Sequence, residues 1–163
     1  MTAPGRRRAR QPHFDSAEQE AYLNLWRTYD RLRMLEDELF GRYGLTAQQY
    51  NALRLLRGSH PHRLPTLAVA ARLVSRAPDI TRMIDRLAER GLVDRERPTD
   101  NRRVVLIGIT EAGLGLLRRL DEPVRDCGRR QMGHLKPAEL TELTRLLRLA
   151  RGPHEKPGSI WNP

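Results

Sequence analysis

An amphipathic helix followed directly by two short strands constrains the fold of this chain more than any other feature. Ile80, Ile84 and Leu87 recur at helical spacing and therefore line one face of a helix. The helix is predicted to begin at Pro78, because proline at the first helical position costs no hydrogen bond. Gly91 is predicted to stop it.

Two strands are predicted after this helix, at residues 92–97 and 104–109, and the second is rich in β-branched residues. Residues 98–101 have turn-forming side chains and join the strands as a hairpin. Side chains alternate along a strand, so Arg95 and Arg97 are expected on one face of the hairpin.

Two more helices precede this unit. Thr46 is a typical N-cap for a helix that ends at Gly58, and residues 67–73 form a short helix after a loop at 59–64. Three helices followed by a hairpin is the order of a winged helix-turn-helix. We place this DNA-binding lobe at about residues 46–109.

Long apolar stripes mark the helix before the lobe, which runs from Ser16 to Gly41. One stripe has alternating steps of four and three residues and consists of Ala21, Leu25, Thr28, Leu32, Leu35 and Leu39. A second, partly aromatic stripe with the same steps consists of Tyr22, Trp26, Tyr29, Arg33, Glu36 and Phe40. Two adjacent stripes give the helix two surfaces to cover, one with its own domain and one with a partner chain.

Two further helices follow the hairpin. The first opens at Thr110 and contains Pro123, which is expected to kink it, and the second starts at Pro137. Both have apolar residues at helical spacing, namely Leu117, Leu120, Val124 and Cys127 in the first and Leu140, Leu143, Leu147 and Ala150 in the second. These outer helices are too apolar to decorate so small a lobe. We therefore expect residues 14–43 and 110–151 to be the dimerisation helices of a homodimer.

The expected fold class is mainly α with a small β-hairpin wing: a winged helix-turn-helix lobe plus a helical dimerisation region. Residues 1–13 contain four arginines and two prolines, and we expect a disordered basic arm there. Residues 152–163 are rich in glycine and proline and are expected to form a flexible tail. Residues 14–151 then form a single domain.

The location follows from what the sequence lacks. No stretch approaches the roughly 20 apolar residues that cross a membrane, and no apolar segment follows the N-terminal arginines as in a secretory signal. The single cysteine, Cys127, excludes an internal disulfide framework and fits a reducing compartment. We expect a cytoplasmic protein with no membrane partner.

The charge of the chain points to a polyanionic partner. The formal net charge is +10, and all but Lys136 and Lys156 of the 30 basic residues are arginines. A surplus of this size attracts nucleic acid at long range. The alternative is a solvated basic surface that has no such partner.

The outer face of the helix predicted from Pro78 suits a major groove. Arginine can donate two hydrogen bonds to guanine, aspartate can accept one from cytosine, and hydroxyl groups reach phosphates or bases. The candidate contacts of this helix and of the turn before it are Ser75, Arg76, Asp79, Thr81, Arg82 and Arg86.

The hairpin adds candidate contacts for a neighbouring minor groove. They are Arg95, Arg97, Asp100, Arg102 and Arg103, of which Arg102 lies at the tip and Asp100 can orient it. The alternative is that the arginines of this region pair with acids on solvated faces. Those acids are Asp85, Glu89, Asp94 and Glu96.

The same segments resemble the MarR family of multiple antibiotic resistance regulators. The match is carried by the helix at 78–90, the junction GLVDRERP, the wing turn at 100–103 and the exit ITEAG at 109–113. The Asp-x-Arg pair and the Thr-Glu-x-Gly exit are specific when they occur together at this spacing. The resemblance covers about residues 16–151.

This resemblance implies a homodimer that binds double-stranded DNA, usually as a repressor, with its recognition helices in successive major grooves of a pseudo-palindrome. Many relatives release DNA when a small aromatic or phenolic ligand binds between the dimer helices and the lobe. Residues that could line such a pocket are Trp26, Tyr29, Arg33, Tyr50 and Leu53, with Arg33 pairing with a carboxylate. The alternative is that these residues pack in the core and the interface.

Nothing in the sequence indicates an enzyme, a cofactor or a metal site. It lacks a glycine-rich phosphate loop, a hydrolase elbow and a zinc-hydrolase motif. His60 and His62 flank Pro61 without a third ligand, and Cys127 lies on an apolar stripe, where thiols are usually inert rather than redox-sensing. The alternative functions are a basic RNA-binding or ribosome-associated protein, although no stacking aromatics accompany the basic face, and an interaction module that binds no nucleic acid.

Overall fold

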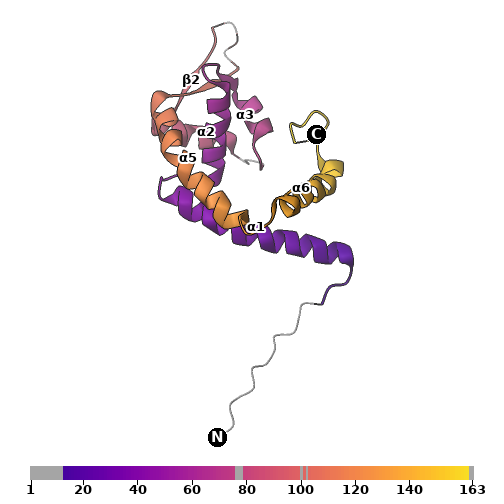
Figure 1. The fold of residues 1–163 in the computed structure, drawn as a ribbon. Coiled ribbons are helices and arrows are strands. Elements are labelled where there is room, and N and C mark those ends of the chain that lie inside the picture. The colour runs from indigo at the N-terminus through magenta and orange to yellow at the C-terminus, as the bar shows by residue number, and fades with distance from the viewer. Residues whose placement is uncertain (1–12, 76–78, 100, 102, 162–163) are drawn as a thin grey trace. The chain divides into compact units, whose positions relative to one another are not determined.

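The computed structural model describes residues 13–161 except 76–78, 100 and 102, and the chain divides into two compact units, Met1–Met34 and Leu35–Pro163. Helix α1, Ala17–Gly41, begins in the first unit and ends in the second. The second unit continues with α2 (Ala47–Ser59), β1 (Leu64–Pro65), α3 (Thr66–Arg72), α4 (Ile80–Glu89), β2 (Val93–Glu96), β3 (Leu106–Ile109), α5 (Glu111–Met132), α6 (Pro137–Arg151) and a 3-10 turn at Gly152–His154 (Figure 1). The predicted fold class, mainly α with a small β wing, is confirmed.

Helix α1 starts and ends where the sequence predicts. The backbone N–H of Leu45 donates to the carbonyl of Phe40 at 3.0 Å, and Gly44 between them has a φ of 63°. Only glycine adopts this left-handed conformation without strain, so Gly44 allows the chain to leave α1 and enter the lobe. Residues 17–31 of α1 are exposed, whereas Phe40 is buried.

Helix α2 begins with the predicted cap. Thr46 Oγ1 accepts a hydrogen bond from the Gln49 N–H at 3.2 Å, and Gln49 Oε1 accepts one from the Thr46 N–H at 2.9 Å. This capping box satisfies backbone donors that every helix start leaves free. It also orients α2 so that Leu53 and Leu56 are buried.

The sheet has three antiparallel strands in the order β1–β3–β2. The predicted hairpin is present, although both of its strands are shorter than expected. Strand β1, in contrast, was missed, because its two residues lie at the end of a predicted loop and are too few to show alternation. Leu64 pairs with Ile107, and the Thr66 N–H donates to the carbonyl of Val105 at 3.1 Å.

Helix α4 begins two residues later than predicted, at Ile80. Its N-cap is Asp79, whose Oδ1 accepts a hydrogen bond from the Arg82 N–H at 2.9 Å. A carboxylate at this position satisfies a free backbone donor and also interacts favourably with the helix dipole, which outweighs the preference of proline for the first turn. The predicted start, Pro78, lies outside the described residues.

The start of α5 explains the Thr-Glu-x-Gly exit. Thr110 Oγ1 accepts a hydrogen bond from the Gly113 N–H at 3.1 Å and donates one to the carbonyl of Gly91 at 2.7 Å. The Thr110 N–H donates to the carbonyl of Leu92 at 3.1 Å. A Cβ on Gly113 would overlap this Leu92 oxygen and lie 2.7 Å from Ile109 Cγ1. The motif thus joins α5 tightly to the turn that follows α4.

The core of the second unit is aliphatic, as the low aromatic content predicts. Helices α2 and α5 run side by side across it (Figure 1). Its fully buried side chains are Leu53, Leu56, Val69, Ile84, Leu87, Ile107, Leu117 and Leu120. Each such leucine or isoleucine stabilises the fold by about 1.5–3 kcal/mol relative to exposure. The helices α2, α3, α4 and α5 and the central strand β3 all contribute to this set, so the core joins every layer of the lobe.

Helix α6 has no buried residue, although it carries the predicted apolar stripe. Beyond it, Arg151 Nη2 donates to the carbonyl of Trp161 at 3.1 Å, and Arg151 pairs with Glu155. These contacts fold residues 152–161 back toward the end of α6. The flexible tail and the basic arm, whose residues 1–12 lie outside the described residues, stay predictions.

Candidate nucleic-acid interface

Helix α4 separates its apolar and basic residues between two faces. Met83, Ile84 and Leu87 are buried in the core, while Arg82 and Arg86 are exposed. The two arginines are four residues apart and therefore lie on the same face, one turn from each other. Within the described residues, neither guanidinium has a hydrogen-bond or ion-pair partner. The predicted recognition face is thus rigidly supported and has unoccupied donors.

The start of α4 uses its predicted contacts differently. One carboxylate oxygen of Asp79 caps the helix, so this residue is part of the backbone structure in addition to any contact with a base. Ser75 is exposed, and its hydroxyl oxygen accepts a hydrogen bond from Gln48 Nε2 of α2 at 3.2 Å. Thr81 is exposed on the first turn. Arg76 lies outside the described residues.

The wing confirms one of the expected alternatives for a single arginine. Arg95 of β2 forms an ion pair with Asp85 of α4, as the pairing of these arginines with acids predicts. Arg97 and Arg103 are exposed beyond the ends of the strands. The remaining wing candidates, Asp100 and Arg102, lie outside the described residues.

Arg63, just before β1, was missed by sequence reasoning. It binds Asp94 through Nη1 at 2.6 Å and Nη2 at 3.0 Å, and its Nε donates to Glu96 Oε2 at 2.7 Å. Asp94 and Glu96 were expected to pair with arginines of the helix and the hairpin. Their actual partner is distant in sequence, and no local pattern indicates it.

A second unpredicted arginine links α4 to the end of α1. Arg90, the C-cap residue of α4, donates from Nη1 to the carbonyl of Gly44 at 2.5 Å and from Nη2 to the carbonyl of Tyr43 at 3.0 Å. These carbonyls lie just past the C-terminus of α1, where a cation is favourable. Arg90 therefore ties the recognition helix to the turn between α1 and α2.

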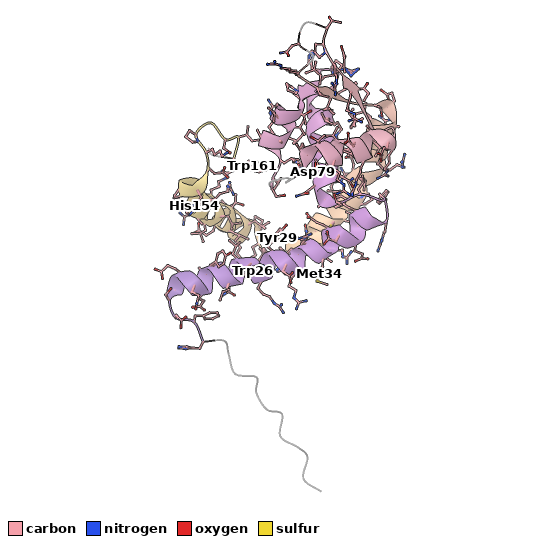
Figure 2. The ribbon with its side chains drawn as sticks, turned by 180° about the vertical axis from the view of Figure 1, so that it is seen from behind. Trp26, Tyr29, Met34, Asp79, His154 and Trp161 are labelled. Atoms are coloured by element: carbon pink, nitrogen blue, oxygen red, sulfur yellow. The ribbon has the colours of Figure 1, made fainter. Side chains whose placement is uncertain are left out.

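The candidate ligand residues are divided between the two units. Trp26 and Tyr29 are exposed on α1 (Figure 2), and with Arg33 they belong to the first unit. Tyr50 and Leu53 belong to the second. Tyr50 stacks on Phe40 with ring centroids 4.5 Å apart, and burial raises the pKa of its hydroxyl. Leu53 is completely buried, which agrees with the alternative of core packing.

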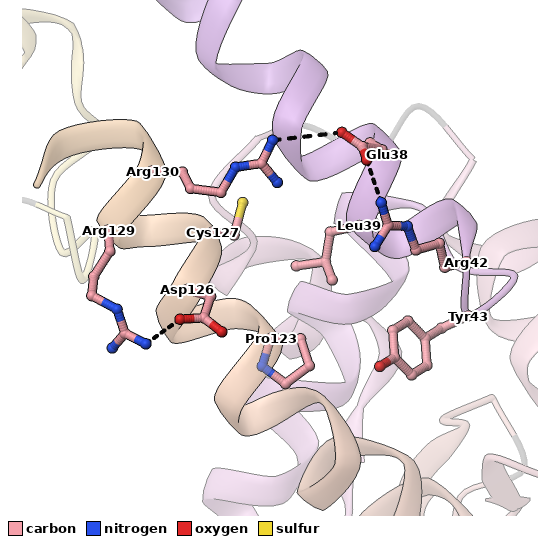
Figure 3. Close-up of a pocket in the computed structure, with 9 residues that line it drawn as sticks. All are labelled: Glu38, Leu39, Arg42, Tyr43, Pro123, Asp126, Cys127, Arg129 and Arg130. Carbon is pink, nitrogen blue, oxygen red and sulfur yellow. Dashed lines mark hydrogen bonds and ion pairs between the residues drawn. The ribbon is translucent and has the colours of Figure 1, made fainter.

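A pocket of about 670 Å³ lies between the C-terminal turn of α1 and α5 (Figure 3). Leu39, Tyr43, Pro123 and Cys127 form its apolar part. The charged residues around it pair with one another: Glu38 with Arg42 and Arg130, and Asp126 with Arg129. Burial raises the pKa of the Cys127 thiol, so the reactive thiolate is disfavoured at neutral pH.

Two searches concern the part of the chain that the structure describes. It contains no group of three or more His, Cys, Asp or Glu residues that could hold a metal ion. None of its helices is long and apolar enough to cross a membrane.

Comparisons with known proteins identify the family. The family model described as "MarR family" matches residues 45–105. The crystal structure of a MarR transcription factor from Planctomyces limnophilus is 59% identical, covers 84% of this chain and 99% of its own, and has a TM-score of 0.68.

Two more distant proteins are regulators by name. The HTH-type transcriptional repressor IacR of Pseudomonas putida is 25% identical over 138 residues, which are 83% of this chain and 81% of IacR. The Bordetella bronchiseptica protein BpsR, whose DNA binding is regulated by 6-hydroxynicotinic acid, is 26% identical, with coverage of 86% and 97% and a TM-score of 0.73. This chain therefore belongs to the MarR family and is a DNA-binding transcription regulator with a winged-helix lobe.

Proposed function

We propose that this regulator is a homodimeric repressor that places Arg82 and Arg86 of each α4 in the major grooves of a pseudo-palindromic operator. The observation that carries the proposal is the pair of exposed arginines on a helix whose opposite face is buried. Within the described residues these side chains have no partner, so their donors are available to guanine edges. Asp79, Thr81, Ser75 and Arg76 would supply the contacts at the start of the helix.

The homodimer is supported by apolar side chains that the single chain leaves exposed. Tyr22, Trp26 and Tyr29 of α1 are 57–63% exposed, and Leu146 and Leu149 of α6 are 49% and 61% exposed. Contiguous apolar surface of this kind usually marks an interface. A twofold dimer would bind half-sites about one helical turn, roughly 10 bp, or a small multiple apart.

The wings would reach the flanking minor grooves. Arg97, Arg102 and Arg103 are the proposed contacts, with Asp100 orienting Arg102. Arg95 differs from them, because its ion pair with Asp85 occupies its guanidinium and holds β2 against α4. We therefore assign Arg95 a positioning role rather than a DNA contact.

A small aromatic or phenolic effector that releases the DNA is also proposed. The related protein BpsR responds to 6-hydroxynicotinic acid, which supports this class of ligand. On α1, Trp26, Tyr29 and Arg33 are the proposed contacts. Tyr50 stays a candidate, whereas the complete burial of Leu53 favours a role in packing.

The competing function is RNA binding, and no observation favours it. Family membership agrees with a regulator that catalyses no reaction. The cytoplasmic location stays a prediction.

The test is binding of the purified protein to duplex DNA from its own promoter, with excess nonspecific duplex and RNA as competitors. We expect a complex that survives both competitors and that Arg82→Ala weakens. The matched control is Arg119→Ala, which removes an exposed arginine of α5 that is not a predicted contact. Equal competition by RNA, or equal effects of the two variants, would refute the proposal.

A further inference from the structure

The strand β2 is held by a charged group that spans the whole sheet. Arg63 lies directly before β1 on one edge, and its partners Asp94 and Glu96 lie in β2 on the other edge. The guanidinium donates to both oxygens of Asp94 and to one oxygen of Glu96 at 2.6–3.0 Å. We name this group of three residues the Arg63 bracket.

Gly108 in the central strand makes the bracket possible. It pairs in register with Asp94, and the guanidinium must pass over it to reach β2. A Cβ on Gly108 would lie 2.7 Å from both Arg63 Nη1 and Asp94 Oδ1. Glycine weakens a strand interior and often marks a close approach. The approaching group at Gly108 is the Arg63 side chain.

The opposite face of β2 is held as well. Because side chains alternate along a strand, Arg95 points away from the face of Asp94 and Glu96. Its partner is Asp85 of the recognition helix α4. The strand is therefore fixed to β1 on one face and to α4 on the other.

The bracket lies where the wing leaves the sheet. The pairing of β2 with β3 ends at Glu96 and Leu106, and Arg97 and Arg103 follow beyond this last pair. A bidentate arginine fixes the direction of its carboxylates as well as their distance. The direction in which the wing departs thus depends on how Arg63 holds the end of β2.

Stability alone does not account for this arrangement. The Arg63 side chain is 32% exposed, and those of Asp94 and Glu96 are about half exposed. Ion pairs in such positions contribute little to folding, and the apolar core already stabilises the lobe. The geometry therefore suits orientation better than it suits stabilisation.

We propose that Arg63 is a positioning residue for the DNA-binding wing, which rests on the proposed function of the lobe. Arg63 does not contact DNA itself, because its guanidinium is engaged by two carboxylates. It sets the direction of the wing, so that the arginines beyond Glu96 meet the DNA backbone. Without the bracket, each wing would sample several directions and bind phosphates less often.

Asp94→Asn gives the sharpest test, because two explanations predict opposite signs. Removing a negative charge near DNA strengthens binding if only the overall charge matters. If the bracket orients the wing, the same change weakens binding, by about three- to tenfold when each wing releases one phosphate, and lowers the salt slope by about one unit for each released phosphate. The measurement is affinity for operator and scrambled duplex at several salt concentrations.

Two companion variants separate orientation from charge and from folding. Arg63→Gln is compared with Arg119→Gln, which removes the same charge from α5, and only the first should weaken binding in this way. Gly108→Ala changes no charge and should weaken binding in the natural background but add little to Arg63→Gln, since both disturb one group. Circular dichroism melting confirms that each variant is folded.

The outcomes are distinct. If Asp94→Asn binds as well as or better than the natural protein, or if Arg63→Gln matches Arg119→Gln, the bracket has no positioning role. If the natural protein itself shows no preference for duplex DNA, the proposed function fails instead. Weakened binding with retained base discrimination by α4 supports the proposal.

Discussion

Gly113, on the first turn of α5, provides the most direct test of how the lobe is assembled. Alanine at this position would place a Cβ against the carbonyl oxygen of Leu92 and 2.7 Å from Ile109 Cγ1. The Leu92 oxygen cannot move away cheaply, because it accepts the hydrogen bond of the Thr110 N–H. Gly113→Ala should therefore separate α5 from the turn after α4.

The magnitude follows from two opposing effects. Overpacking a tight site costs about 1–3 kcal/mol, whereas replacing glycine by alanine in a helix gains at most about 1 kcal/mol. We expect a net loss of about 1–2 kcal/mol in the free energy of unfolding. For a chain of this length that corresponds to a fall in Tm of roughly 2–8 °C.

Gly115 in the same helix is the matched control. A Cβ there would meet only Arg118 Nη2 at 3.6 Å and Arg119 Nη1 at 3.9 Å, which are ordinary contacts with flexible side chains. Gly115→Ala should therefore raise stability by up to about 1 kcal/mol. The same chemical change thus has opposite signs at two positions of one helix.

The assay is urea unfolding followed by circular dichroism at one fixed protein concentration, since the stability of a dimer depends on concentration. If Gly113→Ala unfolds at the same or a higher urea midpoint than the natural protein, the close approach of α5 to Leu92 is not a constraint, and the reasoning is wrong.

Three further predictions concern the interface, the assembly and the thiol. Arg82→Ala should cost about 1–3 kcal/mol for each base edge it no longer binds and relax discrimination at one position of each half-site, whereas Arg102→Ala should weaken operator and scrambled DNA evenly and lower the salt slope by about one unit for each phosphate it no longer binds; unchanged base preference in Arg82→Ala would mean that the recognition face is misplaced. Sedimentation at micromolar concentration should show a dimer, and a stable folded monomer would contradict the interface proposed for α1 and α6. The raised pKa of buried Cys127 predicts slow reaction with a thiol reagent at neutral pH and fast reaction in urea, and rapid modification of the native protein would reopen a redox role.

The sequence by itself determined the features that depend on local patterns. The apolar face of α4, the Thr46 cap and the glycines that end α1 and α4 are fixed by spacing and by backbone preferences within a few residues. The order of the helices and the wing follows from the same signals. The motif at 109–113 was recognised, although its reason, the contact of Gly113 with Leu92, is visible only in three dimensions.

Tertiary structure alone decided the pairings between distant segments. Strand β1 exists because Leu64 meets Ile107, and two residues have no period of their own. Arg63 binds Asp94 and Glu96 across 31 and 33 residues, and Arg90 reaches carbonyls more than 40 residues away. A sequence pattern reports which residue types lie on one face of one element. It carries no information on which of 28 arginines will meet which carboxylate, because that depends on how the elements pack.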